Sequence, residues 1–329
     1  SELCVACAQC EARQSQGNPR FPSYFAQDNR DHRLRGLRLL DSPYYNRYSS
    51  REKEKMQFRT EVDVAKGDFE IGAAEQMLFV GSCFADNLGK RFRENAFPAV
   101  VNPYGVMYNP ASILHTVERW LEVLADASEQ PLPRVAIFTL GTNHVYILKE
   151  TGEIVDNCQK RPQRLFEERE LLVDECADYL QRALHLLKAK VGDNLHVILT
   201  VSPIRYAKYG FHGSQLSKAT LQLAAEKVRR ENPGVVSYFP AYEILNDELR
   251  DYRFYQEDML HPSDQAVEYI WQKFREAYFS KEAEAFMEEW RPIREALGHR
   301  PFNPESEEYQ KFLAQAKEKE RLFKEKYKL

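Results

Sequence analysis

The chain has 329 residues, of which 43% are hydrophobic and 29% are charged. This composition is ordinary for a globular protein and supplies enough apolar side chains for one large domain or two small ones. The formal net charge of −4 gives no general attraction to nucleic acid or to an anionic membrane surface. The totals therefore favour a small molecule or another protein as the partner.

The hydrophobic runs are too short to cross a bilayer. Residues 135–141 and 195–201 have the length of β-strands, whereas a spanning helix needs about 20 apolar residues. The first 21 residues lack the basic start and apolar centre of a secretory signal. Six cysteines without an obvious disulfide framework indicate a reducing compartment. We therefore expect a cytoplasmic protein without a membrane span.

Residues 1–55 differ from the rest of the chain. They are rich in Arg, Asn, Ser and Pro and lack sustained apolar periodicity, so they cannot bury enough surface to offset the entropy of ordering. We expect a disordered or non-native leader. Within it, Cys4, Cys7 and Cys10 have a spacing that could hold part of a metal or iron–sulfur site. No fourth ligand lies nearby in the sequence, so we interpret these cysteines as incidental.

Strands and helices are predicted to alternate from Met56 to about residue 280. The stretch 57–67 resembles a first strand. Further strands are predicted at 76–81, 134–141, 195–203 and 235–245, with a short strand and loop at 98–105. Helices are predicted at 84–95, 110–127, 168–192, 217–232 and 263–274. Strands separated by helices of ten or more residues imply parallel crossovers, hence a three-layer α/β/α sandwich with a mainly parallel sheet.

Two charged helices are predicted after this alternating region, at 281–299 and 306–329. They are interrupted at the proline-containing stretch 299–304. We therefore divide the chain into the leader, an α/β domain at 56–280, and a C-terminal helical extension at 281–329 that packs on or beside the domain.

A candidate nucleophile lies where the strand at 76–81 runs directly into a helix. Gly81 permits a tight turn, and the helix N-terminus that follows favours an anion. Ligands of open parallel sheets bind outside the carboxyl ends of the strands, which is where this turn lies. Either Ser82 or Cys83 is therefore placed to attack a substrate.

Asp258 and His261 form a candidate base and its orienting partner. Their Asp-x-x-His spacing lets the carboxylate accept a hydrogen bond from the imidazole, which fixes the tautomer and stabilises the imidazolium. A structural capping role at the start of the helix 263–274 is the alternative. Ser263 or Asp264 would be the better cap, which leaves His261 available at the sheet edge.

Several blocks of the sequence resemble the GSCFA family, beginning with LFVGSCFA at 78–85. Further similar blocks are at 100–113, 238–274 and 299–304, so the resemblance extends from about Met56 to the C-terminus. That family looks like a branch of the SGNH (GDSL-like) hydrolases, whose members use a three-layer α/β/α fold to cleave or transfer acyl esters, commonly on carbohydrates or lipids. The resemblance thus implies the same fold as the pattern of strands and helices.

The resemblance also implies roles for individual residues. Aligning Gly81 with the glycine of the superfamily's Gly-Asp-Ser block puts Cys83 at the nucleophile position, where the superfamily has serine, and Ser82 at the aspartate position. The Asp-x-x-His block is matched by Asp258 and His261.

The oxyanion donors are implied in the same way. The loop glycine of the second block corresponds to Gly105, which would donate its backbone N–H. The Gly-x-Asn block corresponds to Gly141 and Asn143, and Asn143 would donate its side-chain amide.

Each of these residues has a structural alternative. Cysteine is among the most buried residue types, so Cys83 could pack beneath the helix that follows it, although we favour the nucleophile. Ser82 could cap that helix, which is the interpretation we favour for it. Asn143 could be a turn residue. The remaining thiols, Cys158 and Cys176, are interpreted as a loop residue and a buried helix-face residue.

Arg205 and Lys218 lie in the stretch that follows the strand at 195–203. They could contact an anionic substrate or line a solvated loop, and the sequence leaves both readings open.

We therefore expect a hydrolase or acyltransferase that acts through Cys83, His261 and Asp258 on an acyl ester, either carbohydrate- or lipid-linked or of another small molecule. Such a reaction requires no metal or organic cofactor. The alternative is a non-catalytic carbohydrate- or protein-binding module that retains the fold, because a fold does not fix a function.

Overall fold

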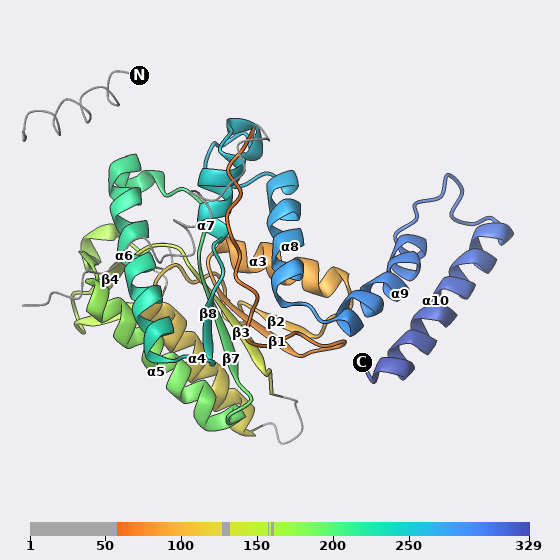
Figure 1. Ribbon diagram of the computed structural model, residues 1–329, viewed down its shortest axis with the longest axis horizontal. Helices are drawn as coiled ribbons and strands as arrows, with labels where there is room; N and C mark the ends of the chain where they lie inside the picture. Colours follow the sequence, from red (N-terminus) through yellow and green to blue (C-terminus); the bar gives the residue numbers. More distant parts are fainter. Residues whose placement is uncertain (1–57, 127–131, 157, 159–160) are drawn as a thin grey trace, which may run out of the picture. The chain divides into compact units, whose positions relative to one another are not determined.

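Five parallel strands form the centre of the fold (Figure 1). Their spatial order is β2-β1-β3-β7-β8, and each neighbouring pair is parallel. Strands β1, β3 and β7 are buried on both faces, which explains why they are nearly continuous apolar runs in the sequence. The bounds are β1 (Met77–Gly81), β2 (Ala99–Val101), β3 (Val135–Leu140), β7 (His196–Val201) and β8 (Val236–Tyr238).

The computed structural model describes residues 58–126, 132–156, 158 and 161–329. Phe58–Leu329 form one compact unit. The expected leader at 1–55, with Cys4, Cys7 and Cys10, lies outside the described residues.

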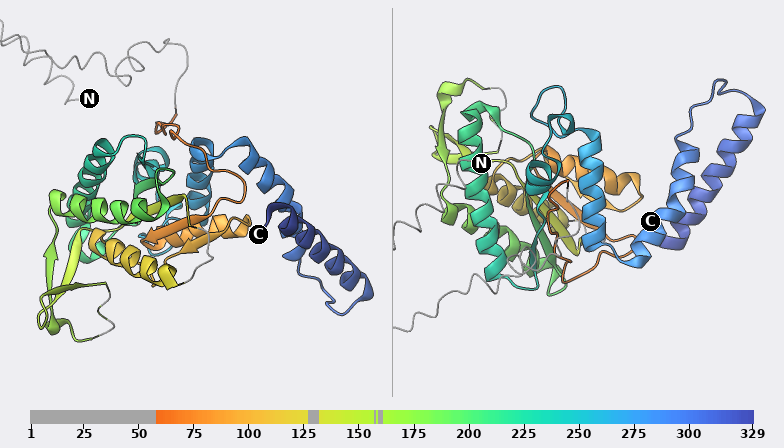
Figure 2. Two further views of the ribbon diagram at one scale, coloured as in Figure 1. Left: turned by 90° about the horizontal axis from the view of Figure 1, so that it is seen from below. Right: turned by 45° about the horizontal axis from the view of Figure 1, so that its top comes forward.

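Two layers of helices cover the sheet, as seen from two further directions in Figure 2. One face carries α4 (Pro110–Asp126), α5 (Val173–Val191) and α6 (Gly210–Glu231), and the other carries α3 (Cys83–Glu94) and α8 (Asp264–Tyr278). The predicted three-layer α/β/α sandwich is confirmed.

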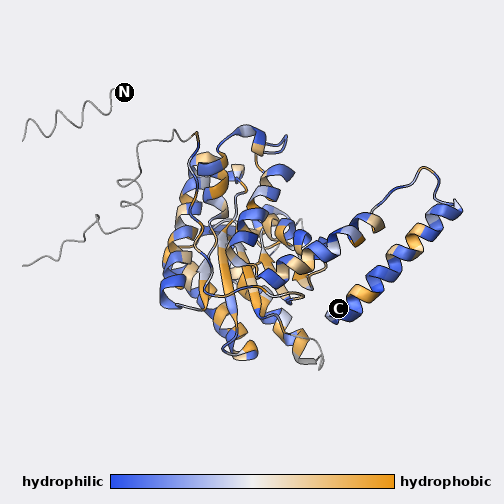
Figure 3. Cartoon of the chain, turned by 45° about the vertical axis from the view of Figure 1, so that its right-hand side comes forward, coloured by the Kyte–Doolittle hydropathy of each residue, from blue (hydrophilic) through white to orange (hydrophobic). Residues whose placement is uncertain are grey.

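The side chains of β1 show how both faces are filled. Leu78 and Val80 pack into the core under α4, α5 and α6, whereas Met77 and Phe79 pack into the core under α3 and α8. Successive side chains of a strand point to opposite faces, so an uninterrupted apolar run supplies both cores. Figure 3 shows the corresponding hydrophobic colouring along the central strands.

The C-terminal helices α9 (Lys281–Leu297) and α10 (Glu307–Tyr327) share the core on the α3 side. Phe286 and Trp290 of α9 and Phe323 of α10 are buried there. The indole nitrogen of Trp290 donates to the carbonyl of Glu94 at 2.9 Å, at the end of α3. The extension therefore packs directly on the α/β part of the chain.

A small antiparallel sheet was not anticipated from the sequence. It has the order β5-β4-β6 and consists of β4 (His144–Leu148), β5 (Glu153–Val155) and β6 (Phe166–Glu170). The predicted helix at 168–192 consequently begins only at Val173. Pairing of β6 with β4 overrides the helical pattern there, and the carboxylate of Glu175 accepts from the Leu172 N–H at 2.8 Å where the helix starts.

The predicted first strand at 57–67 is wrong over its described part. Residues 58–70 contain no strand, and the Val62 N–H donates to the buried carboxylate of Glu248 at 3.0 Å instead of to a neighbouring strand.

The predicted strand at 235–245 is shorter than expected, because β8 ends at Tyr238. The short elements are α7 (Ala241–Glu243), the π-helical η4 (Ile244–Leu249), and the 3-10 turns η2 (Gln163–Leu165), η3 (Ala207–Tyr209) and η5 (Tyr252–Phe254).

The turn at the end of β1 gives a test of the packing. A β-carbon on Gly81, where φ is +145°, would lie 2.2 Å from the carbonyl oxygen of Thr139. We expect Gly81→Ala to lower the free energy of unfolding by about 3 kcal/mol or more, because it adds steric overlap to backbone strain. The matched control is Gly152→Ala, since Gly152 has φ +72° and open space around it; it should lose only about 1–2 kcal/mol. Denaturant unfolding followed by circular dichroism measures both, and equal losses would contradict the packing argument.

Candidate functional site

The carboxyl ends of β1, β3 and β7 border a cavity of about 230 Å³, which we call the Cys83 cavity. Its position agrees with the rule that open parallel sheets bind ligands at this edge. Residues far apart in the sequence meet in its lining, among them Ser82, Cys83, Tyr108, Gly141, Ser202 and His261.

The Ser82 hydroxyl is engaged by the protein itself. Ser82 is only 1% exposed, and its Oγ accepts from the Phe84 N–H at 3.2 Å as the cap of α3. The same oxygen lies 3.0 Å from the hydroxyl of Thr139. These two contacts give Ser82 the environment of a helix cap.

Cys83 is the partly exposed member of the pair and the first residue of α3. Its Sγ lies 3.7 Å from the hydroxyl of Tyr108, which follows β2 in the chain. The first N–H groups of a helix have no intrahelical partner, and no hydrogen bond within the described part of the chain uses the Cys83 N–H. Cys83 therefore brings both a thiol and a backbone N–H without an intrahelical partner to the lining of the cavity.

Tyr108 stays protonated beside this thiol. Burial is the largest cause that raises the pKa of the Tyr108 phenol above its ordinary value, and the hydrogen bond with Cys83 raises it further. A protonated phenol is a hydrogen-bond donor. Sequence reasoning did not single out Tyr108, although it lies in the block 100–113 that resembles the GSCFA family.

The imidazole of His261 is held by Asp258. His261 Nδ1 and Asp258 Oδ2 are 2.6 Å apart, and Asp258 Oδ1 accepts from the backbone N–H groups of His261 at 2.9 Å and Leu260 at 2.8 Å. The hydrogen bond from the His261 N–H, followed by that from Leu260, lowers the pKa of Asp258 to about 2. The carboxylate is therefore ionised at any physiological pH, and its bond to Nδ1 leaves Nε2 of His261 for proton transfer.

The two expected oxyanion donors are engaged elsewhere. The Gly105 N–H donates to the carbonyl of Asn102 at 2.9 Å. Asn143 is 3% exposed, and its Nδ2 donates to the carbonyl of Leu171 at 2.8 Å. Neither residue lines the Cys83 cavity. Gly141 does line it, but its N–H donates to the carbonyl of Tyr108 at 2.9 Å. In the structure the N–H groups of Gly105 and Gly141 and the side-chain amide of Asn143 thus all donate within the protein.

Arg205 lies between the loop after β7 and the turn that carries His261. It lines the Cys83 cavity, its backbone N–H donates to the carbonyl of Leu260 at 3.0 Å, and its Nη1 donates to the carbonyl of Met259 at 3.2 Å. Arg205 therefore ties the loop after β7 to the turn that carries His261.

The GSCFA family model matches residues 76–132 and 129–274, and the model described as the GSCFA domain protein C-terminal domain matches residues 290–329. The chain belongs to the GSCFA family. No curated protein matches this GSCFA chain.

Several solved structures are similar to this GSCFA protein at low identity. A GDSL-like lipase from Bacteroides thetaiotaomicron is 14% identical, with 62% of this chain and 87% of the lipase covered at a TM-score of 0.39. A catalytic mutant of an acetylxylan esterase from Geobacillus stearothermophilus is 15% identical, with 64% and 98% covered at 0.37. A carbohydrate esterase family 3 protein from Talaromyces cellulolyticus is 10% identical, with 60% and 94% covered at 0.36.

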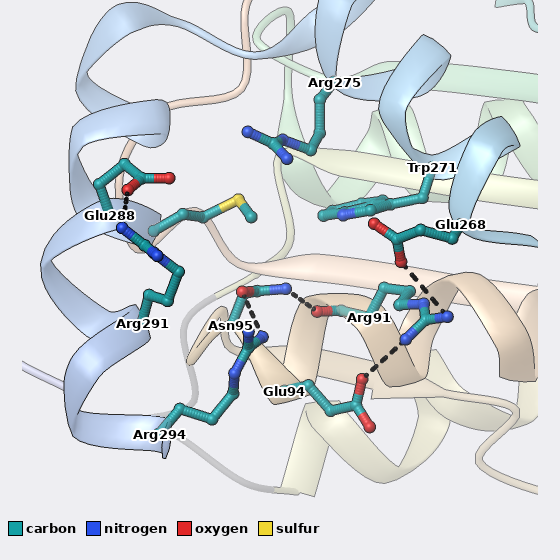
Figure 4. A pocket seen from close by; sticks show the side chains of 10 residues that line it. Arg91, Glu94, Asn95, Glu268, Trp271, Arg275, Glu288, Arg291 and Arg294 are labelled. Atoms are coloured by element: carbon teal, nitrogen blue, oxygen red, sulfur yellow. Dashed lines mark hydrogen bonds and ion pairs between the residues drawn. The ribbon is translucent and has the colours of Figure 1, made fainter. Parts of the chain in front are cut away.

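A second cavity of the GSCFA chain, of about 550 Å³, lies between α3, α8 and α9 (Figure 4). Its charges are largely paired: Arg91 with Glu94 and Glu268, Arg275 with Glu284, and Arg291 with Glu288. Arg294 donates to the side-chain oxygen of Asn95 at 2.9 Å. Its lining includes no serine, cysteine or histidine, so we assign it to the contact between α9 and the α/β part of the chain.

Every helix within the described ranges is too short or too polar to span a membrane.

The three described thiols should differ in reactivity. Cys176 is fully buried, and burial raises its pKa to about 12; burial also raises the pKa of Cys158. We expect iodoacetamide to label Cys83 in the native protein at least tenfold faster than Cys176, because only the Cys83 thiol faces a cavity at a helix N-terminus. Peptide mass spectrometry over a time course measures the rates. Labelling of all three thiols at one rate would contradict the assignment of Cys83 to the cavity.

Proposed function

We propose that this GSCFA protein is a hydrolase or acyltransferase of acyl esters, related to the SGNH hydrolases, with Cys83 as its nucleophile. One observation carries the proposal. A partly exposed thiol at a helix N-terminus shares a cavity with a histidine whose ring is held by an ionised carboxylate. A nucleophile, a base and a group that orients the base are the recurring parts of acyl-transfer sites.

In the proposed reaction, His261 removes the proton from Cys83 through Nε2, and the thiolate attacks the acyl carbonyl carbon. The carbonyl π electrons move to its oxygen and form a tetrahedral oxyanion. When this intermediate collapses, the C–O bond to the alcohol breaks, and His261 returns the proton to the leaving oxygen. The product is an acyl thioester on Cys83.

The second half of the reaction releases the acyl group. Water or an acceptor alcohol attacks the thioester carbonyl while His261 takes its proton, and collapse expels the Cys83 thiolate, which His261 reprotonates. Water gives a free acid and an alcohol gives a new ester. Asp258 stabilises the imidazolium in both halves of the reaction without becoming protonated, which agrees with its low pKa.

The oxyanion is proposed to accept hydrogen bonds from the Cys83 N–H and the Tyr108 hydroxyl. Gly105 and Asn143 use their donors within the protein, whereas Tyr108 lies beside Sγ and stays protonated. Donors that are already oriented toward the developing charge stabilise the transition state most.

The walls of the Cys83 cavity support a short acyl group as its occupant. Ile204, Tyr206 and Leu260 supply apolar and aromatic surface in a volume of about 230 Å³. The cation Lys208 at the same wall is paired with Glu168 at 2.9 Å. We therefore propose small-molecule or carbohydrate esters of short acids as substrates.

Substitutions of the two neighbours Ser82 and Cys83 test the proposal against a panel of short-chain acyl esters and acylated sugars. Cys83→Ala should abolish turnover with little loss of stability, because it removes only the sulfur from a partly exposed site. Cys83→Ser should keep a trace, since the hydroxyl gives up its proton less easily. Ser82→Ala is the matched control: it should cost about 1 kcal/mol of stability through the lost cap and retain most activity.

The opposite pattern, an inactive Ser82→Ala beside an active Cys83→Ala, would move the nucleophile to Ser82. If the folded wild-type protein turns over no ester in the panel, the alternative of a non-catalytic binding module replaces the proposed enzyme.

A further inference from the structure

A lysine is buried directly behind the Cys83 cavity. Lys218 of α6 is 2% exposed, and its Nζ donates to the carbonyl oxygens of Gly141 at 2.7 Å and Ser202 at 2.9 Å. Gly141 and Ser202 both line the cavity, whereas Lys218 does not. The ammonium therefore lies behind the cavity wall, at the carboxyl ends of β3 and β7, and is separated from the cavity by these two residues.

This lysine has no carboxylate partner within the part of the chain that the structure describes. Its neighbours are the two carbonyl oxygens and the ring of Tyr242, whose centroid is 5.9 Å from Nζ. Burial alone lowers the pKa of Lys218 to about 7. Burying a cation without a counter-ion is unfavourable, so the position calls for an explanation beyond packing.

Strand pairing does not need the ammonium. β3 and β7 pair along their whole length, from Val135↔His196 to Leu140↔Val201, and the Ser202 N–H continues the ladder to the Leu140 carbonyl at 2.8 Å. The ammonium instead binds the carbonyl oxygens that follow these strands. It engages the negative ends of two peptide dipoles that would otherwise be available beside the reaction site, and it adds a positive charge there.

We propose that Lys218 is a positioning residue that makes the electrostatic potential of the Cys83 cavity positive, by holding the Gly141 and Ser202 carbonyls and placing an ammonium behind the wall. Its consequence for catalysis, stabilisation of the thiolate and of the acyl oxyanion, rests on the proposed function. The potential itself does not depend on turnover and can be measured separately.

Other charged groups act on the same cavity. Arg205 and Lys208 line it, Lys208 is paired with Glu168, and Asp258 lies behind His261. A test of Lys218 must therefore compare variants at one pH. It must also use a quantity that does not depend on the fraction of Cys83 that is ionised.

Two alkylating reagents provide that comparison. Iodoacetate is an anion and iodoacetamide is neutral, and both react with the thiolate, so the ratio of their rates at Cys83 is independent of how much thiolate is present. Removing a positive charge several ångströms away should lower the ratio of the iodoacetate rate to the iodoacetamide rate by about 3- to 10-fold, because it weakens the attraction of the anionic reagent. We expect that decrease in Lys218→Gln at pH 6, measured as labelling rates of the peptide that contains Cys83.

The effect should depend on pH in a defined direction. The folded protein carries the Lys218 charge below about pH 7 and loses it above that value. The difference between wild type and Lys218→Gln should therefore be largest at pH 6 and shrink by pH 9. In the wild type alone, the ratio of the iodoacetate rate to the iodoacetamide rate should fall between pH 6 and pH 9 by more than it does for a free thiol. This comparison tests the proposal even if the variant does not fold.

Lys227→Gln is the matched control, because Lys227 lies on the same helix and pairs with Asp174 on the exposed surface at 2.7 Å. Its ratio should equal that of the wild type. A Lys218→Gln ratio equal to the wild type at pH 6 would overturn the proposal, even if the variant is less stable. A changed ratio in a protein that turns over no ester would leave the proposal standing and overturn only the proposed function.

Discussion

The close approach of Gly81 to Thr139 is the constraint on which the rest of the site depends. A side chain at Gly81 would meet the backbone of β3 at 2.2 Å, so only glycine lets β1 turn into α3 against its neighbouring strand. The turn is fixed by the Gly81 N–H, which donates to the side-chain oxygen of Asn102 at 2.9 Å, and by the Ser82 N–H, which donates to the Thr139 carbonyl at 3.0 Å. With Ser82 as the cap, the next residue, Cys83, becomes the first of the helix and faces the cavity.

The second half of the site comes from a separate turn, which becomes part of the site only because it meets the Gly81 turn at the edge of the central sheet. Asp258 and His261 are three positions apart in the chain and form their own turn, with Met259 at a positive φ of 59°. Arg205 connects this turn to the loop after β7, while Lys218 holds the ends of β3 and β7 from behind. The proposed nucleophile and the proposed base thus belong to separate local structures, and the relation between them is set by the edge of the central sheet.

The sequence predicts those features that depend on local pattern. Nearly continuous apolar runs predict β1, β3 and β7, because strands buried on both faces need apolar side chains at most positions. The Asp-x-x-His spacing predicts the contact between Asp258 and His261, because both lie in one turn. Features that depend on distant partners were not predictable in this way. The amide of Asn143 faces Leu171, the Gly105 N–H closes a turn with Asn102, and residues 166–170 become a strand because β4 lies beside them. Tyr108 was missed for the same reason, since its contact with Cys83 exists only after β1 and β2 pair.

The central claim is that acyl transfer passes through Cys83, and the most direct measurement is the location of a trapped acyl group. The native protein is incubated with a slowly hydrolysed acyl ester, quenched in acid, digested and analysed by fragmentation mass spectrometry. The account predicts one added acyl mass on the peptide that contains residues 77–92, located on Cys83 and removed by hydroxylamine at neutral pH, as a thioester is. An acyl mass located on Ser82, or an ester turned over with no acyl mass on Cys83, would contradict it.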